Sequence, residues 1–256
     1  MCYQTGARPP LPPIAGGAGV TTRDLELTSA DGTRFGASSA VTDAPEAPGM
    51  VILPDVRGLH GFYKDLAARF AEAGIHAVAF DYFGRTAGVE ERTDDFEFWP
   101  HVQQTKPDTI AADVGAAVEL IRSHEGGGAK AVFTVGFCFG GRNSFNQAGR
   151  GHGLSGVIGF YGRPAPADEN DANAPIDLAS TYGCPVLGLF GGADQAISHD
   201  DVEAFGKALE AAGVDHEIQV YEGAPHSFFD RAFEQFKDEC DDAWRRILSF
   251  VERNSA

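Results

Sequence analysis

A cysteine placed between two glycines is the residue of this 256-residue chain best suited to nucleophilic chemistry. Cys138 is the centre of Gly-Phe-Cys-Phe-Gly at 136–140, between an apolar segment that predicts a buried strand and a segment that predicts a helix. A strand-to-helix turn this tight strains the central residue, so its neighbours two positions away must lack side chains. The start of the helix favours a thiolate, and the amide of Phe139 is a candidate oxyanion donor. The pattern predicts a nucleophilic cysteine, with a buried structural cysteine as the alternative.

An acid and a histidine follow later strands in the order that such a nucleophile requires. Asp194 comes after the apolar segment 186–190, and His226 comes after the alternating segment 217–221. We therefore expect His226 to pair with Cys138 and Asp194 to hold the imidazole in the right tautomer. The alternatives are a solvated loop histidine and another aspartate close by in the chain. The remaining histidines do not have this placement at a strand end.

Regular alternation of strands and helices must position these residues. Strands that alternate with helices of ten or more residues indicate an α/β fold, with a mostly parallel sheet and helices on both faces. The expected strands are 24–28, 35–41, 50–53, 76–80, 131–135, 156–161, 186–190 and 217–221. The expected helices are 62–73, one capped by Asp108, one from Phe139, 201–212, and a last one that carries Phe233, Phe236, Cys240, Trp244, Ile247 and Val251.

Two segments depart from this alternation. The first 20 residues are rich in proline and glycine and predict an extended arm, 1–20. Residues 90–106 lack a clean period, which is typical of a loop over a site or of a partly helical excursion. Residues 21–256 contain no internal repeat and no linker, so we expect a single domain there.

The composition argues against several classes of function. Lys and Arg total 20 against 37 Asp and Glu, and the formal net charge of −17 repels phosphate backbones and anionic membranes, so no nucleic-acid or membrane partner is expected. No apolar run approaches the ~20 residues that span a bilayer, and residues 1–20 lack the apolar core of a secretory signal. Four irregularly spaced cysteines predict neither a disulfide framework nor a zinc site. We expect a cytoplasmic protein with no metal, phosphate-binding loop or dinucleotide cofactor.

Several motifs together resemble the dienelactone hydrolase family, within the α/β-hydrolase fold. They are Gly-Phe-Cys-Phe-Gly-Gly at 136–141, Gly-Gly-Ala-Asp at 191–194, Ala-Pro-His-Ser-Phe at 224–228, Leu-Pro-Asp-Val-Arg-Gly at 53–58 and Asp-Tyr-Phe-Gly-Arg at 81–85. The resemblance extends from about Met50 to the end of the chain and excludes the arm. It implies hydrolysis of a lactone or another ester through a thioester intermediate. It also implies a second oxyanion donor, the backbone amide of Val56.

The chain departs from the family pattern at two positions. Family members often have Glu at the position of Asp55, where the carboxylate helps to control the ionisation of the thiol; a turn-capping aspartate is the alternative. An arginine that holds the substrate carboxylate lies four residues after the histidine in the family's dienelactone enzymes, whereas this chain has Asp230 there. The candidates for substrate binding are Arg57, Arg85, Arg231, Trp99, Tyr161 and Phe228.

These observations predict a cysteine-dependent hydrolase of lactone or carboxylic ester bonds in small molecules. A general carboxylesterase or thioesterase on the same triad is one alternative. A non-catalytic ligand receptor that retains the α/β-hydrolase fold is another. A redox sensor that uses Cys138 is disfavoured because no resolving cysteine lies nearby in the sequence. The oligomeric state is left open.

Overall fold

One eight-stranded sheet organises the part of the chain that the structure describes, residues 7–13, 19–93 and 95–255 of a computed structural model. Across the sheet the order is β1 (Val20–Thr28), β2 (Arg34–Thr42), β4 (His76–Phe80), β3 (Gly49–Leu53), β5 (Val132–Phe137), β6 (Gly156–Phe160), β7 (Val186–Gly191) and β8 (His216–Tyr221). β2 is antiparallel to β1 and β4, and every other pair is parallel. The mostly parallel sheet expected from the sequence is confirmed.

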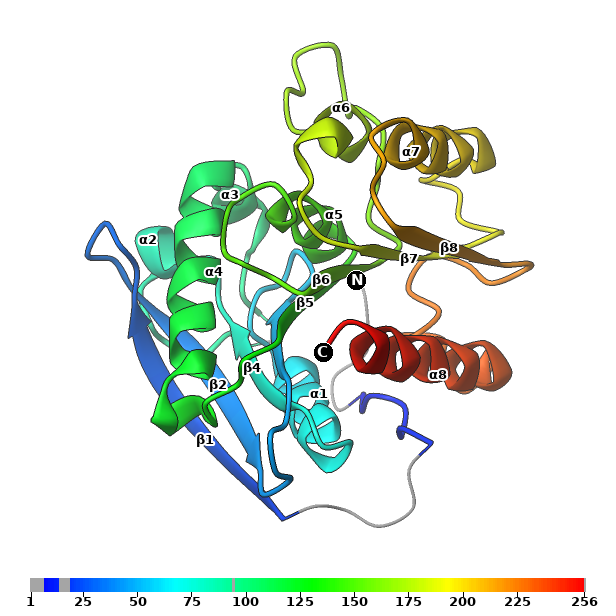
Figure 1. The fold of residues 1–256 in the computed structure, drawn as a ribbon. Coiled ribbons are helices and arrows are strands. Elements are labelled where there is room, and N and C mark those ends of the chain that lie inside the picture. The colour runs from blue at the N-terminus through cyan, green and yellow to red at the C-terminus, as the bar shows by residue number, and fades with distance from the viewer. Residues whose placement is uncertain (1–6, 14–18, 94, 256) are drawn as a thin grey trace.

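Helices cover both faces of this sheet (Figure 1). One face is covered by α4 (Pro107–Arg122), α5 (Phe139–Gln147) and α7 (His199–Ala211), and the other by α1 (Gly61–Glu72) and α8 (Lys237–Arg253). The last two are held together by aromatic packing, since the rings of Phe70 and Trp244 lie 5.0 Å apart. Shorter helical turns are α2 (Gly84–Ala87), α3 (Trp99–Val102), α6 (Pro175–Leu178), η1 (His124–Gly126) and η2 (Ala179–Thr181).

Burial explains why the central strands have continuous apolar sequences. Every residue of β3, β4, β5, β6 and β7 is buried, as expected of parallel strands covered on both faces. The edge strand β1 instead alternates between half-buried and exposed residues and carries charged side chains, which discourage pairing with another chain. Because Cys138 directly follows β5, it leaves the sheet near its middle.

Helix boundaries differ from the sequence expectation where proline or tertiary packing decides them. α4 begins at Pro107, after Lys106 in the cap position, so Asp108 lies in the first turn rather than capping the helix. Proline is favoured there because its missing N–H would have no acceptor. The aromatic pattern predicted a start of the last helix that is too early, because Phe233 and Phe236 precede Lys237, the first residue of α8.

The described part of the N-terminal arm packs against the C-terminal helix. Pro9 and Pro10 are buried, and the carbonyl oxygen of Pro10 accepts a hydrogen bond of 3.2 Å from the indole N–H of Trp244. β1 begins at Val20, the last residue of the expected arm. The rest of the arm, 1–6 and 14–18, lies outside the described residues.

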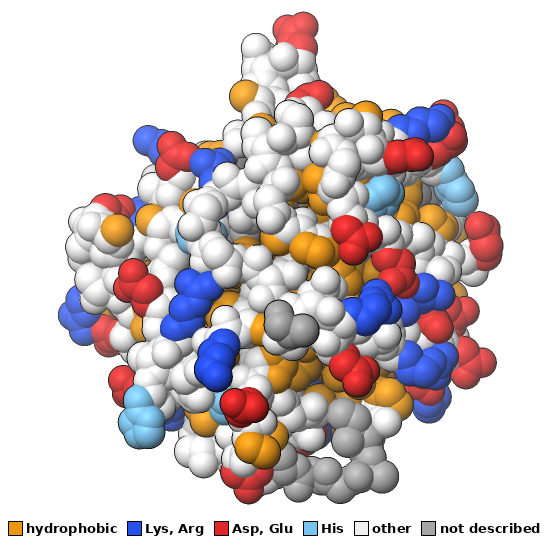
Figure 2. All heavy atoms as spheres, in the orientation of Figure 1, with side chains coloured by type: hydrophobic (Ala, Val, Ile, Leu, Met, Phe, Trp, Pro, Cys, Tyr) orange, Lys and Arg blue, Asp and Glu red, His pale blue; other side chains and the backbone are white. Residues whose placement is uncertain are grey.

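Acidic and basic side chains lie interspersed on the face shown in Figure 2. Ion pairs join several of them; Arg246 of α8, for example, contacts Glu217 of β8 at 2.5 Å and Asp242 at 2.6 Å. No helix within the described part of the chain has the length and apolar character needed to cross a membrane.

Candidate active site

The turn between β5 and α5 holds Cys138 in a strained conformation. Its φ of 56° and ψ of −114° lie outside the regions that a residue with a side chain ordinarily adopts, at a cost of about 1–3 kcal/mol. Two backbone hydrogen bonds hold it there: its N–H donates to Phe160 O at 3.0 Å, and its carbonyl accepts from the N–H of Arg142 at 3.1 Å. Such strain persists where the surrounding structure imposes it, as at functional sites.

The glycines around Cys138 are required by close backbone contacts. A Cβ on Gly136 would lie 1.9 Å from Gly140 O, and a Cβ on Gly140 would lie 2.1 Å from Leu53 O and 2.2 Å from Pro54 O. No side chain can be accommodated at either distance. The short distances from Gly140 to Leu53 O and Pro54 O also mean that the loop after β3 packs directly against the cysteine turn. The segment that contains Val56 therefore lies beside this turn.

The carboxylate of Asp194 is bonded to the imidazole of His226. Asp194 Oδ2 lies 2.6 Å from His226 Nδ1, and Asp194 Oδ1 accepts a 2.8 Å hydrogen bond from the N–H of Ala196. The side chain of Asp194 is 1% exposed and that of His226 is 29% exposed. The nearby acids are placed differently: Asp200 is exposed, and Asp201 accepts a hydrogen bond from the N–H of Ser198 at the start of α7.

The pKa of His226 depends on its hydrogen bonds to Asp194 and Cys138. Burial alone would lower the pKa of its imidazole, but hydrogen bonds to Asp194 and to Cys138 raise that pKa from 6.5 to about 10. A group with that pKa is protonated at neutral pH. The structure therefore brings the sulfur of Cys138, the imidazolium of His226 and the carboxylate of Asp194 together at the carboxyl end of the parallel sheet.

The sequence predicts that two backbone amides, those of Phe139 and Val56, stabilise an oxyanion. Phe139 is the first residue of α5, so its N–H has no acceptor within the helix. Val56 lies two residues after Pro54, whose carbonyl accepts a 2.7 Å hydrogen bond from the hydroxyl of Tyr82. The ring of Tyr82 also packs edge-on against that of Phe139, with centroids 5.3 Å apart. Tyr82 thus touches both donor segments, a positioning contact that sequence reasoning did not identify.

Asp55 is fully buried in the loop after β3. Its Oδ1 accepts a 2.8 Å hydrogen bond from the N–H of Arg57, and its own N–H donates to the hydroxyl of Tyr63 at 3.0 Å. The pKa of Tyr82 is raised well above its usual value, mainly by burial and then by the charges of Asp55, Asp81 and Cys138. Asp55 therefore caps a turn and also contributes negative charge to the region of the sulfur.

A further buried carboxyl group, Asp230, adjoins the histidine. The hydroxyl of Tyr161 donates to Asp230 Oδ2 at 3.0 Å, and the ring of Tyr161 lies 4.9 Å from that of His226. Asp230 is 1% exposed; burial, and next the charge of Asp55, raise its pKa well above the usual value. The sequence marked Asp230 only as a departure from the family pattern and did not predict its bond to Tyr161.

The candidate substrate-binding residues are distributed unevenly. Tyr161 lies against the imidazole, and the buried ring of Phe228 packs edge-on against Tyr161 at 5.7 Å. Arg57 is buried, and its guanidinium lies 3.0 Å from His60 Nε2. The other three lie apart from the triad's hydrogen bonds: Arg231 and Trp99 are exposed, and Arg85 is bound to Asp31, Asp113 and Ser29.

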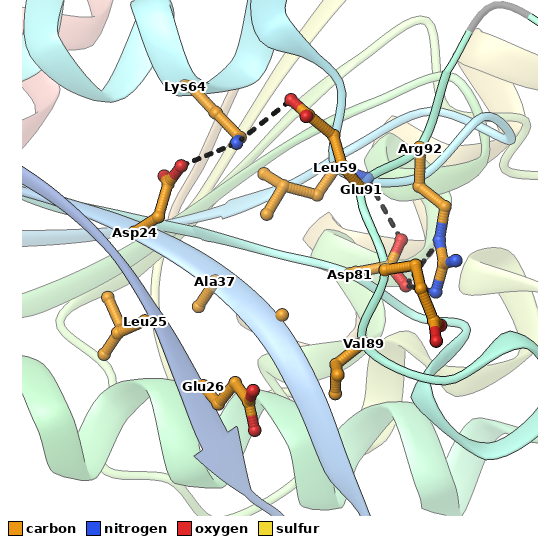
Figure 3. Close-up of a pocket in the computed structure, with 12 residues that line it drawn as sticks. Asp24, Leu25, Glu26, Ala37, Leu59, Lys64, Asp81, Val89, Glu91 and Arg92 are labelled. Carbon is orange, nitrogen blue, oxygen red and sulfur yellow. Dashed lines mark hydrogen bonds and ion pairs between the residues drawn. The ribbon is translucent and has the colours of Figure 1, made fainter.

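A cavity of about 530 Å³ lies over β1 and β2 rather than at the triad (Figure 3). Lys64 spans it with contacts to Asp24 at 2.8 Å and Glu91 at 3.5 Å, and Arg92 binds Asp81 at 2.9 Å. None of the three triad residues lines this cavity. In the described ranges 7–13, 19–93 and 95–255, no cluster of three or more His, Cys, Asp or Glu is placed to hold a metal ion.

The chain is similar in sequence to known hydrolases. A model of the dienelactone hydrolase family matches residues 35–255. The chain is 28% identical to a provisionally named carboxymethylenebutenolidase of Escherichia coli (strain K12) over 215 residues, which is 83% of this chain and 79% of the relative. It is 25% identical over 211 residues to a probable 2-oxo-3-(5-oxofuran-2-ylidene)propanoate lactonase of Bradyrhizobium sp, which is 80% of this chain and 83% of that one.

Solved structures share the fold. A crystal structure from Klebsiella pneumoniae, provisionally described as a dienelactone hydrolase, matches with a TM-score of 0.79 and 26% identity over 91% of this chain and 99% of that chain. A dienelactone hydrolase-like promiscuous phosphotriesterase from metagenomic libraries matches with a TM-score of 0.76 and 21% identity, over 94% and 100% of the two chains. These likenesses confirm the α/β-hydrolase fold that the sequence predicted.

Proposed function

The chain belongs to the dienelactone hydrolase family and is a hydrolase that acts on ester bonds, and from this premise we propose that it cleaves small-molecule lactones or carboxylic esters with Cys138 as nucleophile. His226 is the proton carrier and Asp194 orients it. The amides of Val56 and Phe139 bind the oxyanion. This proposal needs Cys138 as a free thiol and therefore a reducing compartment such as the cytoplasm.

In the acylation step the sulfur of Cys138 forms a bond to the carbonyl carbon, and the carbonyl electron pair moves onto oxygen. The amides of Phe139 and Val56 donate to that oxygen; such a donor is worth about 2.7–4 kcal/mol at sites where one has been removed. Collapse of the intermediate breaks the ester C–O bond. The imidazolium of His226 gives its proton to the departing oxygen, which leaves a thioester on Cys138 and a neutral imidazole.

In the deacylation step the same imidazole acts as a base. The thioester carries no charge on sulfur, so one cause of the high pKa of His226, its contact with the Cys138 thiolate, is removed. The neutral imidazole takes a proton from water, and the hydroxide oxygen attacks the thioester carbonyl. Cleavage of the C–S bond releases the carboxylic acid and restores the thiolate and the imidazolium.

The single observation that carries this proposal is the position of the His226 ring, whose Nδ1 lies 2.6 Å from Asp194 Oδ2 and which is also hydrogen-bonded to Cys138. A receptor that merely retained the fold would need neither a buried carboxylate on Nδ1 nor a thiol at the other side of the ring. We assign Asp55 a secondary role, that of a buried negative charge that opposes thiolate formation and moderates the reactivity of the sulfur. Arg57 is the proposed substrate contact, while the buried rings of Tyr161 and Phe228 support the imidazole from behind.

Turnover of 4-nitrophenyl acetate by the wild type and by Cys138→Ala tests the proposal. We expect loss of at least about 10³-fold in kcat for the variant, by analogy with other nucleophile deletions. Cys184→Ala is the matched control, because burial raises the pKa of Cys184 to about 11 and this thiol lies outside the triad. Equal rates for the wild type and Cys138→Ala would refute a covalent mechanism on this sulfur.

A further inference from the structure

We propose that Asp81 is a positioning residue for the reaction: it holds the loop after β3 so that the backbone amide of Val56 can bind the oxyanion. The inference deepens the proposed function and rests on it, since it concerns the same Cys138 site. It follows from the hydrogen bonds that fix this loop on both sides of Val56.

Val56 lies at the accessible point of a tight turn. It is half-buried, whereas the other residues of 53–59 are buried. The N–H of Gly58 donates to Asp55 O at 3.1 Å, and the N–H of Arg57 donates to Asp55 Oδ1 at 2.8 Å. Neither bond uses the N–H of Val56, and no described residue accepts a hydrogen bond from it. Such an amide can stabilise charge that develops on a substrate oxygen, provided that the turn is held in place.

Two adjacent residues at the end of β4 hold the loop on either side of this turn. Before the turn, Pro54 O accepts a 2.7 Å hydrogen bond from the hydroxyl of Tyr82. After the turn, the N–H of Leu59 donates to Asp81 Oδ1 at 3.1 Å. Because β3 and β4 pair in parallel, their loops leave the sheet at the same edge. The turn that contains Val56 is therefore supported from β4, and Asp81 provides the support on its far side.

Asp81 is itself fixed by several hydrogen bonds (Figure 3). It is 3% exposed, and its Oδ2 accepts from the N–H of Phe83 at 3.0 Å and from Arg92, 2.9 Å from Nη2 and 3.2 Å from Nε. Arg92 also donates to Gly88 O at 2.6 Å. A buried ion pair seldom stabilises a fold more than apolar residues of the same size would. The bond from Leu59 to the second oxygen of Asp81 gives this pair a positioning role.

The approach of Asp81 to the loop depends on a glycine. Gly58 has a φ of 78°, which residues with side chains rarely adopt, and a Cβ there would lie 2.3 Å from Asp81 Oδ1. Without a side chain at this position, the carboxylate reaches the N–H of Leu59. Gly58→Ala therefore disturbs the same contact as a substitution of Asp81, but it changes no charge.

Two reactions of Cys138 test the proposal, because only one of them forms an oxyanion. Hydrolysis of 4-nitrophenyl acetate forms one in both of its steps, whereas alkylation by iodoacetamide displaces iodide from a saturated carbon and forms none. In Asp81→Asn the one remaining carbonyl oxygen should turn to the charged guanidinium of Arg92, which leaves an NH2 group facing the N–H of Leu59. We expect kcat and kcat/KM to fall together by about 10- to 100-fold, with KM nearly unchanged. The rate of alkylation should change little by comparison.

Asp113→Asn is the matched control. Asp113 is also a buried carboxylate paired with an arginine, Arg85 at 2.6 Å, but it lies on α4 and its ion pair does not involve the loop after β3. Both its kcat and its rate of alkylation should equal those of the wild type. If Asp81→Asn does not fold, Gly58→Ala serves instead and should likewise lower kcat far more than alkylation. Its control is Gly61→Ala, where a Cβ meets nothing within 4 Å.

The outcomes separate this inference from the proposed function. Turnover by Cys138→Ala at the wild-type rate would refute the nucleophile, whatever the effect of Asp81. Normal dependence on Cys138 with wild-type kcat in folded Asp81→Asn, or in Gly58→Ala where the first variant does not fold, would refute the inference alone. Equal losses of turnover and alkylation would also overturn it, because Asp81 would then support the whole site and not the oxyanion donor.

Discussion

Nδ1 of His226 lies 2.6 Å from Oδ2 of Asp194, across 32 residues of sequence. The two residues follow β7 and β8, which pair in parallel from Val186↔His216 to Gly191↔Tyr221. The contact is therefore fixed by the register of the sheet, which brings both loops to the same edge. Because Asp194 occupies Nδ1, Nε2 is the nitrogen left for Cys138.

The first prediction concerns the histidine. His226→Ala should lower kcat for 4-nitrophenyl acetate by at least about 10³-fold, since nucleophile and base act as a unit. His199→Ala is the control, because His199 also follows β7 but its Nε2 is bonded to the carbonyl oxygen of Gly192, at 2.9 Å. A loss of less than tenfold in His226→Ala would reassign the base.

The second prediction is the pH dependence of the thiol. Because the pKa of His226 is raised from 6.5 to about 10, the imidazolium persists through neutral pH and loses its proton only as pH rises through about 10. The rate of Cys138 alkylation by iodoacetamide should be level across neutral pH, and kcat/KM should decline only near pH 10. The contribution of this ion pair to the free energy of unfolding should be full below pH 6.5 and lost through the same alkaline range.

Asp194→Asn provides the comparison for this profile. It removes the carboxylate that helps to raise the pKa of His226, so the alkaline decline should move to lower pH. A wild-type decline centred near the ordinary histidine value would contradict the assigned ion pair.

The third prediction separates the two roles of Asp55. Asp55→Asn keeps an acceptor for the N–H of Arg57 but removes the buried negative charge. The acidic limb of the Cys138 alkylation profile should move to lower pH, because a thiolate is then less strongly opposed. Asp242→Asn should leave the profile unchanged. The same profile in Asp55→Asn and wild type would make Asp55 a turn residue only.

The fourth prediction concerns the backbone of the cysteine turn. Gly136→Ala should lower the free energy of unfolding by at least about 1–3 kcal/mol, because its Cβ would lie 1.9 Å from Gly140 O. Gly61→Ala, at the first position of α1 where a Cβ meets nothing within 4 Å, should be neutral or stabilise by up to about 1 kcal/mol. Urea unfolding of the two variants measures the difference, and equal stabilities would show that the turn tolerates a side chain.

The sequence predicted the parts of the fold whose pattern is local. Continuous apolar runs marked the buried strands, and the glycines around Cys138 marked a turn that admits no Cβ. The contact between Tyr161 and Asp230 could not be predicted, because it joins residues 69 apart on different loops and neither has a local signal. The ion pairs of Arg85 could not be predicted either, since its partners Asp31 and Asp113 are distant in the sequence.

The central claim is that the acyl group of the substrate is carried on the sulfur of Cys138. Rapid acid quenching of wild-type protein during turnover of 4-nitrophenyl acetate, followed by peptide mass analysis, tests it directly. We expect one acetyl group on the peptide that contains Cys138, removed by neutral hydroxylamine as a thioester is. An acetyl group on another residue, or steady product release with no acylated protein and full activity in Cys138→Ala, would contradict the account.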